Sequence, residues 1–335
     1  MADLPRVPWR LRVLSVVGPV LLLSFLAVAL VPEVDVDITA PEVAEAAQTE
    51  CLPTGKLDSV RALNRFAATV RGGGEFAGAD VGASTVLQDG RRLLVFGDTL
   101  RAADFEGQRF VRNSMLVFSP GCASVVMPAD HGALIPDRAD GVGYWPMSVA
   151  RARRPGYDLV IVFAQRVRST GGPEDAFAFE NLGPAAALFV VLRGETPQLA
   201  RVQDFGPDRP GTEHPTWGAA SAVQRDGPDG DWLYLYGTSR PQVEGVFGFA
   251  LRVARVRPEE VLEQDRWRYW DGATWSADPD AAAELIGAIG GVSQTLSVFA
   301  KNDRGDAVSK RDEVLRTEGA AWVPDAPTRP FSAPV

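Results

Sequence analysis

Short apolar runs, separated by turns rich in glycine and proline, make up most of the chain after residue 56. Residues 83–87 and 93–96 are two β-type runs, and the Asp-Gly pair between them is a strong signal for a tight hairpin. Residues 57–70 instead place apolar side chains near helical spacing, which favours one short helix over an entry strand. The pattern therefore predicts an all-β protein with little helix.

Further apolar runs extend this prediction along the chain. The additional expected elements are strands at 114–118, 187–192, 247–256 and 320–323, a brief helix at 259–264 after Pro258, and an aromatic edge hairpin at 266–275.

An internal repeat groups these runs into four units, which begin at Asp80, Trp145, Trp217 and Val292. Each unit has a small-residue stretch leading into an apolar strand, then a turn, then a second apolar strand that ends in a polar residue. The units start 65 to 75 residues apart, which leaves room for four strands each and predicts a β-propeller. Because the inner strands of a propeller line one channel, residues at equivalent positions of the units are expected around one pocket.

The composition agrees with this fold class and narrows the choice of partners. The chain has 335 residues, 33 glycines, 25 prolines and a formal net charge of −9. Acidic and basic residues are mixed without a basic block, so nucleic acid is a poor partner. Clefts rich in carboxylates suit neutral sugars, although a mildly acidic surface also serves solubility.

Residues 13–32 carry no charge and are numerous enough to span a membrane. Arginines precede this segment and acidic residues follow it, which places residues 1–12 in the cytoplasm and the rest outside. The alternative is secretion after cleavage of a signal peptide at Ala44-Glu45-Ala46, although that site lies unusually far beyond the apolar run. The prediction is therefore a membrane anchor at 13–32, an acidic tether at 33–56 and an extracytoplasmic propeller domain at 57–335.

Export makes disulfide bonds possible, and the chain has two cysteines, Cys51 and Cys122. A bridge between them would tie the end of the tether to the first sheet, whereas the alternative is two separate thiols. His131 and His214 do not have the spacing of metal ligands, and no phosphate-binding loop or dinucleotide motif is present. Neither a metal nor a cofactor is expected.

Asp80 and Asp98 are the candidate catalytic pair. Asp80 precedes the first strand of the predicted hairpin and Asp98 follows the second, so antiparallel pairing would bring them together at one rim of the sheet. Two carboxylates across a small gap are the arrangement that glycoside hydrolysis uses, one as proton donor and the other as base or nucleophile. The competing interpretation is that each is a turn or cap residue.

Other side chains are candidates for binding a sugar at the same rim. Tyr144, Trp145 and Trp217 could stack on sugar rings, although aromatic residues at these positions also fill cores. The candidate hydroxyl contacts are Arg112, Asn113, Gln165, Arg240, Gln294, Lys310 and Asp312. Their competing role is hydrogen bonding between sheets.

These residues belong to motifs that, in order and spacing, are similar to a known family. The motifs are Asp80-Val-Gly-Ala-Ser, Phe96-Gly-Asp98-Thr, Arg112-Asn113-Ser114, Tyr144-Trp145-Pro146, Trp217-Gly218, Gly291-Val-Ser-Gln-Thr-Leu-Ser and Ser309-Lys310-Arg-Asp312. Over residues 74–331 the chain resembles the endo-D-arabinanases of glycoside hydrolase family 183, which are known from actinobacteria.

The resemblance implies a five-bladed β-propeller that cuts internal α-D-arabinofuranosyl linkages of cell-envelope arabinogalactan and lipoarabinomannan, with catalytic aspartates at positions 80 and 98. We expect an inverting reaction with Asp80 as base and Asp98 as acid. Only four repeat units are visible, so either residues 57–74 help to close the ring or the propeller is truncated. The rival functions are a non-catalytic envelope protein that binds arabinan or scaffolds partners, and an enzyme for another furanoside polymer such as L-arabinan.

Overall fold

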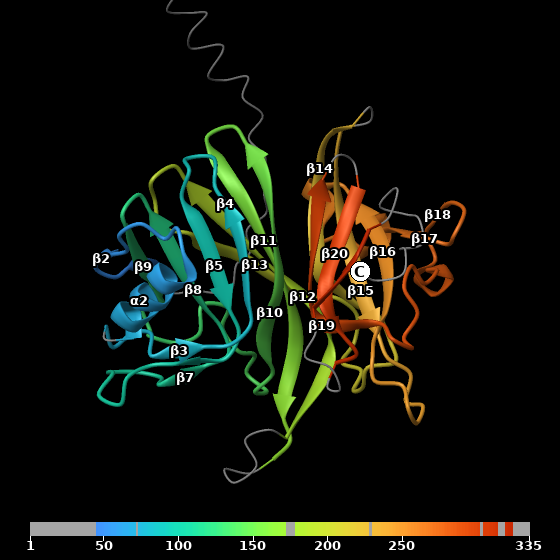
Figure 1. The fold of residues 1–335 in the computed structure, drawn as a ribbon, viewed down its shortest axis with the longest axis horizontal. Coiled ribbons are helices and arrows are strands. Elements are labelled where there is room, and N and C mark those ends of the chain that lie inside the picture. Colours follow the sequence, from blue (N-terminus) through green and yellow to red (C-terminus); the bar gives the residue numbers. More distant parts are fainter. Residues whose placement is uncertain are drawn as a thin grey trace, which may run out of the picture. The chain divides into compact units, whose positions relative to one another are not determined.

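The computed structural model describes residues 45–71, 73–171, 178–227, 230–301, 304–313 and 319–323. Over these residues the chain forms antiparallel β-sheets and a single α-helix, α2 (Val60–Arg71), as the sequence predicted (Figure 1). None of the helices in these ranges is both long and apolar enough to cross a membrane. The predicted anchor at 13–32 and the first part of the predicted tether lie outside the described residues.

The first sheet contains the predicted hairpin. It has the strand order β1–β9–β8–β5–β4, and β2 also pairs with β9. The bounds are β1 (Ala46–Gln48), β2 (Leu52–Pro53), β4 (Gly82–Val86), β5 (Arg92–Phe96), β8 (Ser114–Ser119) and β9 (Cys122–Pro128). Antiparallel pairing of β4 with β5 confirms the hairpin. The end of the predicted tether is not extended away from the domain, because β1 and β2 join this sheet through their backbone groups.

Each of the other three sequence repeats also forms one sheet. The second sheet is β10 (Gly143–Arg154), β11 (Tyr157–Ser169), β12 (Phe179–Leu192) and β13 (Gln198–Asp204). The third is β14 (Thr216–Gly227), β15 (Gly230–Ser239), β16 (Ala250–Val256), β17 (Arg268–Trp270) and β18 (Trp275–Ser276). The fourth is β19 (Val292–Lys301), β20 (Arg304–Arg311) and β21 (Gly319–Trp322).

A smaller sheet and three short 3₁₀-helices complete the described regular structure. The small sheet is β3 (Gly78–Ala79), β6 (Thr99–Leu100) and β7 (Phe110–Val111). The 3₁₀-helices are η1 (Pro258–Glu260), η2 (Gln264–Arg266) and η3 (Pro279–Ala281). The brief helix predicted at 259–264 is therefore only a single 3₁₀ turn. No fifth sheet of blade size lies within the described residues. Residues 60–71, which were considered as a segment that could help to close the ring of blades, form a helix.

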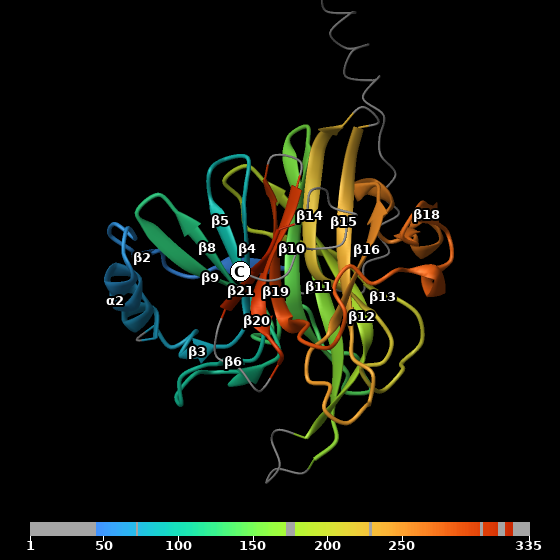
Figure 2. The same ribbon diagram turned by 45° about the vertical axis from the view of Figure 1, so that its right-hand side comes forward.

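The sheets pack in sequence order through their first strands, since β10 contacts both β4 and β14, and β14 contacts β19 (Figure 2). Apolar side chains fill the spaces between consecutive sheets. One cluster of buried side chains contains Leu93 of the first sheet and Val160 of the second, another contains Phe163 of the second and Leu235 of the third, and another contains Leu251 of the third and Leu296 of the fourth. The core is therefore divided into layers between sheets, and the first strands share a central position.

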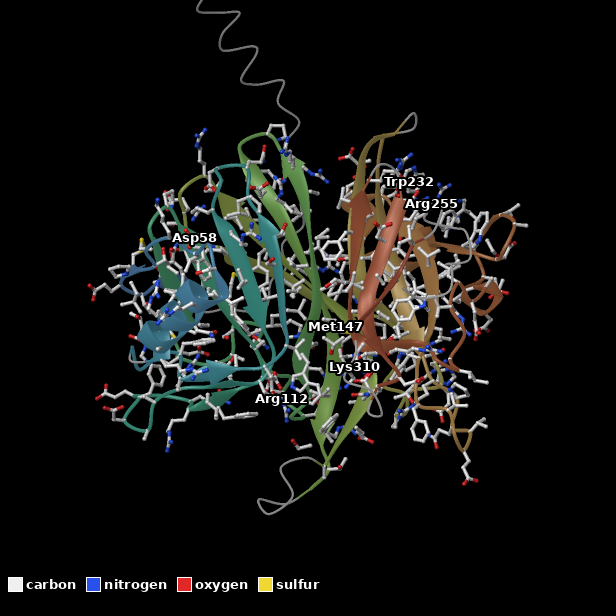
Figure 3. The ribbon with its side chains drawn as sticks, in the orientation of Figure 1. Asp58, Arg112, Met147, Trp232, Arg255 and Lys310 are labelled. Carbon is white, nitrogen blue, oxygen red and sulfur yellow. A yellow bond between two sulfur atoms is a disulfide. The ribbon has the colours of Figure 1, made fainter. Side chains whose placement is uncertain are left out.

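The aromatic hairpin predicted at the edge of the third sheet is present as β17 and β18, in which Trp270 pairs with Trp275. The guanidinium of Arg255 lies between two indole rings, 4.1 Å from the centre of Trp232 and 4.3 Å from that of Trp275 (Figure 3). Cation–π contacts of this kind hold the edge strands against the sheet.

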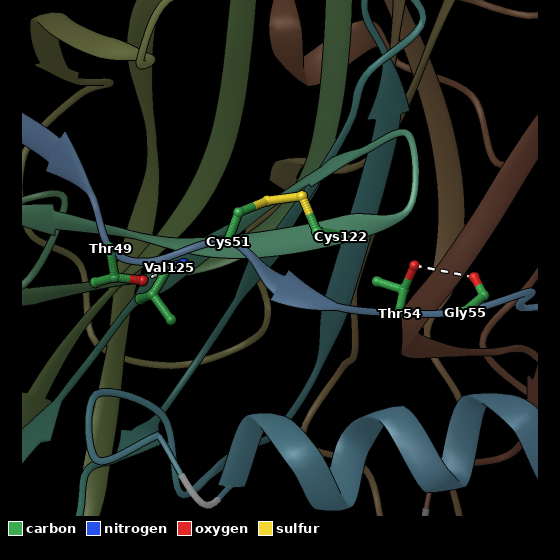
Figure 4. Close-up of a disulfide and its surroundings, with 6 residues drawn as sticks. All are labelled: Thr49, Cys51, Thr54, Gly55, Cys122 and Val125. Atoms are coloured by element: carbon green, nitrogen blue, oxygen red, sulfur yellow. Dashed lines mark hydrogen bonds between the residues drawn. A yellow bond between two sulfur atoms is a disulfide. The ribbon is translucent and has the colours of Figure 1, made fainter.

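A disulfide joins Cys51 to Cys122, with 5.4 Å between their Cα atoms (Figure 4). Beside it the backbone N–H of Val125 donates to the hydroxyl of Thr49 at 3.0 Å. Helix α2 packs on the same sheet, where Phe66 meets Phe118 edge to face at 5.3 Å. The segment that enters the domain is thus fixed to the outer part of the first sheet.

Buried polar contacts lock the turn of the β4–β5 hairpin onto the second sheet. The carboxylate of Asp158 accepts the backbone N–H of Gln88 at 2.7 Å and the guanidinium of Arg151 at 3.1 Å. Both charged side chains are almost fully buried, with exposed fractions of 5% and 9%. Because this end of the hairpin is fixed, the opposite end is held in a defined position relative to β10.

Candidate active site

The open end of the β4–β5 hairpin brings Asp80 and Asp98 together, as the sequence predicted. Asp80 lies between β3 and β4, and Asp98 lies between β5 and β6, so two sheets meet at this point. The backbone N–H of Asp80 donates to the carbonyl of Asp98 at 3.1 Å. Val81, the next residue, has a φ of 38°, a strained conformation for a β-branched residue. Such strain is typical of functional sites.

Gly97 leaves room for the carboxylate of Asp80. A Cβ atom at position 97 would lie 2.7 Å from the Oδ1 atom of Asp80, closer than real Cβ contacts come. The backbone N–H of Gly97 also donates to the carbonyl of Asp80 at 3.0 Å. The absence of a side chain at this position therefore sets where the Asp80 carboxylate lies.

Asp98 is half-buried and is oriented by Trp145, whose indole Nε1 donates to its Oδ1 at 2.6 Å. Burial raises the pKa of Asp98, and the charges of Asp80 and Asp137 raise it further, while the bond from Trp145 and the charge of Arg112 oppose the rise. Burial also raises the pKa of Asp80. The residue as a whole is exposed, but protein atoms packed around its carboxyl group displace part of the surrounding water.

Asp137 is a third carboxyl group near this pair, and sequence reasoning did not select it. Burial raises its pKa, and the charge of Arg112 opposes the rise. Arg112, labelled in Figure 3, lies between β7 and β8 and donates through Nη2 to the hydroxyl of Ser169 at 2.7 Å. A Cβ on Gly143 would collide with Arg112 and lie 2.7 Å from Oδ1 of Asp137, so this glycine admits both side chains.

A pocket of about 180 Å³ opens beside Asp80. It is lined by Asp80, Val81, Gly97, Trp145, Pro146, Met147, Gln165, Phe179, Asn181, Gln294, Thr295 and Glu313. These residues come from the first, second and fourth repeats, so Trp145, Gln165 and Gln294 lie together as the repeat predicted. Trp145 meets Phe179 edge to face at 4.5 Å, which gives the pocket an aromatic wall.

Two polar groups of the pocket are notable. Gln165 is only 5% exposed, and its Nε2 has no hydrogen-bond partner among the described residues. Glu313 follows β20, and its Oε2 accepts the backbone N–H of Gln294 at 2.7 Å. Sequence reasoning selected the neighbouring Asp312 and missed Glu313, because nothing local distinguishes the two acidic residues.

Three of the predicted binding residues are parts of the core. Asn113 is 1% exposed and donates both amide hydrogens, to the carbonyls of Ile135 and Tyr144, each at 3.0 Å. Tyr144 is buried and donates to Asp204 at 3.0 Å, and burial raises the pKa of its hydroxyl. Trp217 packs on Tyr269 at 5.1 Å. The interpretation as structural residues fits these three.

The remaining predicted contacts lie outside the pocket lining. Arg240 stacks over Phe249 at 5.0 Å, Lys310 is a residue of β20, and Asp312 follows that strand with a φ of 54°. The pocket therefore draws on the first, second and fourth sheets, whereas the equivalent positions of the third sheet pack inward.

The chain belongs to the family described as "Domain of unknown function (DUF5005)", whose model matches residues 64–334. A solved structure from Bacteroides ovatus ATCC 8483, named a "putative hydrolase", has a similar fold with a TM-score of 0.54 and 18% identity, over 77% of this chain and 69% of that one. No curated protein matches the sequence.

Two glycosidase structures show weaker similarity. A family 117 glycoside hydrolase of Zobellia galactanivorans has a TM-score of 0.41 and 10% identity, over 87% of this chain and 74% of that one. An exo-1,5-alpha-L-arabinanase from a bovine ruminal metagenomic library has a TM-score of 0.31 and 11% identity, over 76% and 97% of the two chains. Similarity at this level does not establish a shared fold.

Proposed function

We propose that this chain is a glycoside hydrolase of the cell envelope that cleaves internal α-D-arabinofuranosyl linkages of arabinan, on a propeller-type scaffold of four sheets. The observation that carries the proposal is the backbone-linked pair Asp80 and Asp98, two carboxyl groups of raised pKa. Asp80 lines the pocket, and Asp98 accepts a hydrogen bond from Trp145 of the pocket wall. Two neighbouring carboxyl groups with perturbed pKa values beside a pocket are typical of acid–base catalysis.

The pocket walls support a sugar as the substrate. The rings of Trp145 and Phe179 offer apolar surface to the face of a furanose, and the amides of Gln165, Asn181 and Gln294 suit hydroxyl groups. Arabinan as the particular polymer rests on the resemblance of the motifs around Asp80 and Asp98. The disulfide agrees with an extracytoplasmic domain, which we propose is held at the membrane by residues 13–32.

For the chemistry we propose inversion. The Asp80 carboxylate accepts a proton from the water that attacks the anomeric carbon, while the protonated Asp98 donates its proton to the departing glycosidic oxygen. The bond from Trp145 orients Asp98, and Gly97 leaves the space that Asp80 occupies. Burial favours the protonated form of Asp98 that the acid role requires.

The test is incubation of the full-length protein with arabinogalactan, followed by chromatography of the released oligosaccharides. Release that is lost in both Asp80→Asn and Asp98→Asn supports the proposal, because each substitution removes an acid–base group and keeps the shape of the side chain. Binding without release by the unaltered protein would mean a non-catalytic arabinan-binding protein. Normal release by both variants would show that the catalytic pair is elsewhere.

A further inference from the structure

We infer that Glu313 and Gln165 form a sugar subsite beside Asp80, which binds a neutral pentose ring by its hydroxyl groups. This subsite rests on the proposed glycosidase function and adds residues that recognise the substrate. It joins side chains from the second and fourth sheets at the pocket that Asp80 lines.

Gln165 provides a hydrogen-bond donor that the folded chain leaves unused. Its side chain is 95% buried in β11, and Nε2 has no partner among the described residues, although buried amide groups normally have one. Burying an unpaired amide costs free energy, and a ligand oxygen would offset that cost once a rotation of the side-chain amide brings the buried Nε2 toward the pocket.

Glu313 provides the complementary acceptor. One of its carboxylate oxygens, Oε2, is fixed by the backbone N–H of Gln294 at 2.7 Å, which holds the side chain at the pocket wall. The loop position of Glu313 is itself fixed, because its backbone N–H donates to the carbonyl of Phe247 at 3.2 Å. The second oxygen of this oriented carboxylate can accept from a hydroxyl group of a ligand.

A donor and an acceptor in one pocket match the chemistry of sugar hydroxyls, since each hydroxyl both accepts and donates. The aromatic wall of Trp145 and Phe179 covers the apolar face of a ring, and Met147 of β10, labelled in Figure 3, adds a further apolar contact.

The negative charge of Glu313 makes the subsite selective. A neutral pentose can donate hydrogen bonds to the carboxylate, whereas a sugar that carries a carboxylate would be repelled at short range. The subsite therefore favours unmodified arabinose units over uronic acids.

The inference is tested with the variants Glu313→Gln and Gln165→Met, which keep side-chain size, and with Glu263→Gln as a control, since Glu263 lies on the surface in an ion pair with Arg266. Equilibrium binding of D-arabinose is measured by NMR titration, and KM and kcat are measured separately on arabinogalactan. We expect each pocket variant to weaken D-arabinose binding and to raise KM by about tenfold, with kcat changed less, while the control matches the unaltered protein. Gln165→Met should not lower Tm, because it removes an unpaired buried amide.

Several results would overturn the inference. Unchanged D-arabinose binding in both pocket variants would show that they do not form the subsite, even if arabinogalactan is cleaved. Loss of kcat in Glu313→Ala that added azide restores would place Glu313 in the bond-breaking chemistry instead of in binding. If the unaltered protein binds D-arabinose through these two residues but cleaves nothing, the subsite stands and the proposed hydrolase function fails.

Discussion

Replacing Gly97 by alanine should impair catalysis without unfolding the protein. The new Cβ atom would lie 2.7 Å from Oδ1 of Asp80, and ordinary contact begins at 3.4 Å, so the carboxylate must retreat by about 0.7 Å. The obstructing atom is the end of a flexible side chain at the protein surface, so the backbone can stay in place. A misplacement of nearly 1 Å in a catalytic group costs about 10- to 100-fold in rate, or about 1.4 to 2.7 kcal/mol in the activation free energy.

The assay compares kcat/KM on arabinogalactan and Tm for Gly97→Ala and for Gly78→Ala. Gly78 is the matched control, because it lies two residues before Asp80 and a Cβ atom there meets nothing within 4 Å. We expect a loss of activity in the first variant only, with Tm values within about 2 °C of the unaltered protein for both. Full activity of a folded Gly97→Ala protein would refute the assignment of Asp80, and an equal loss in both variants would point to a general effect on the loop.

Four further substitutions test the surrounding framework. Asp98→Asn should abolish activity and raise Tm at pH 7. Burial raises the pKa of Asp98 above its ordinary 3.8, so the folded protein loses stability as pH rises through the folded pKa and the carboxyl group ionises. The gain in Tm should therefore vanish well below pH 3.8, where the carboxyl group is protonated in both the folded and the unfolded protein. Trp145→Phe removes the donor that opposes this rise, so the alkaline limb of the pH–activity profile, which the proposed acid Asp98 sets, should move to higher pH. Asp158→Ala leaves Arg151 buried and unpaired, which should lower the free energy of unfolding by about 3 to 5 kcal/mol in urea titrations. Cys51→Ser removes a disulfide between residues 71 positions apart in the sequence. The loss of loop-closure entropy in the unfolded chain predicts that the free energy of unfolding falls by about 4 kcal/mol, so an unchanged Tm would show that the bridge adds no stability.

The hairpin and its two aspartates could be predicted because the interactions that form them are local. An Asp-Gly turn between two short apolar runs fixes antiparallel pairing, and antiparallel pairing brings Asp80 to the backbone of Asp98. The helix over residues 60–71 and the aromatic edge hairpin of the third sheet were predicted for the same reason. Spacing within a short segment was sufficient in each case.

The small outer strands and the end of the tether were harder to predict. β1 and β2 are only three and two residues long, too short to show a strand periodicity, and they pair with β9 through backbone groups, which every sequence offers. Glu313 and Asn181 were missed because they reach the pocket only after the sheets have packed. No pattern within their own segments marks them as neighbours of Asp80.

The sequence by itself determined the all-β class, the four repeated units and the hairpin that pairs Asp80 with Asp98. Only the tertiary structure decided which of the equivalent residues line the pocket. Side chains alternate between the two faces of a strand, and a bulge shifts that alternation, so small register changes after Trp145 and Trp217 give these residues different surroundings. Trp145 lies in the pocket and donates to Asp98, whereas Trp217 is buried against Tyr269, although both tryptophans begin a repeat.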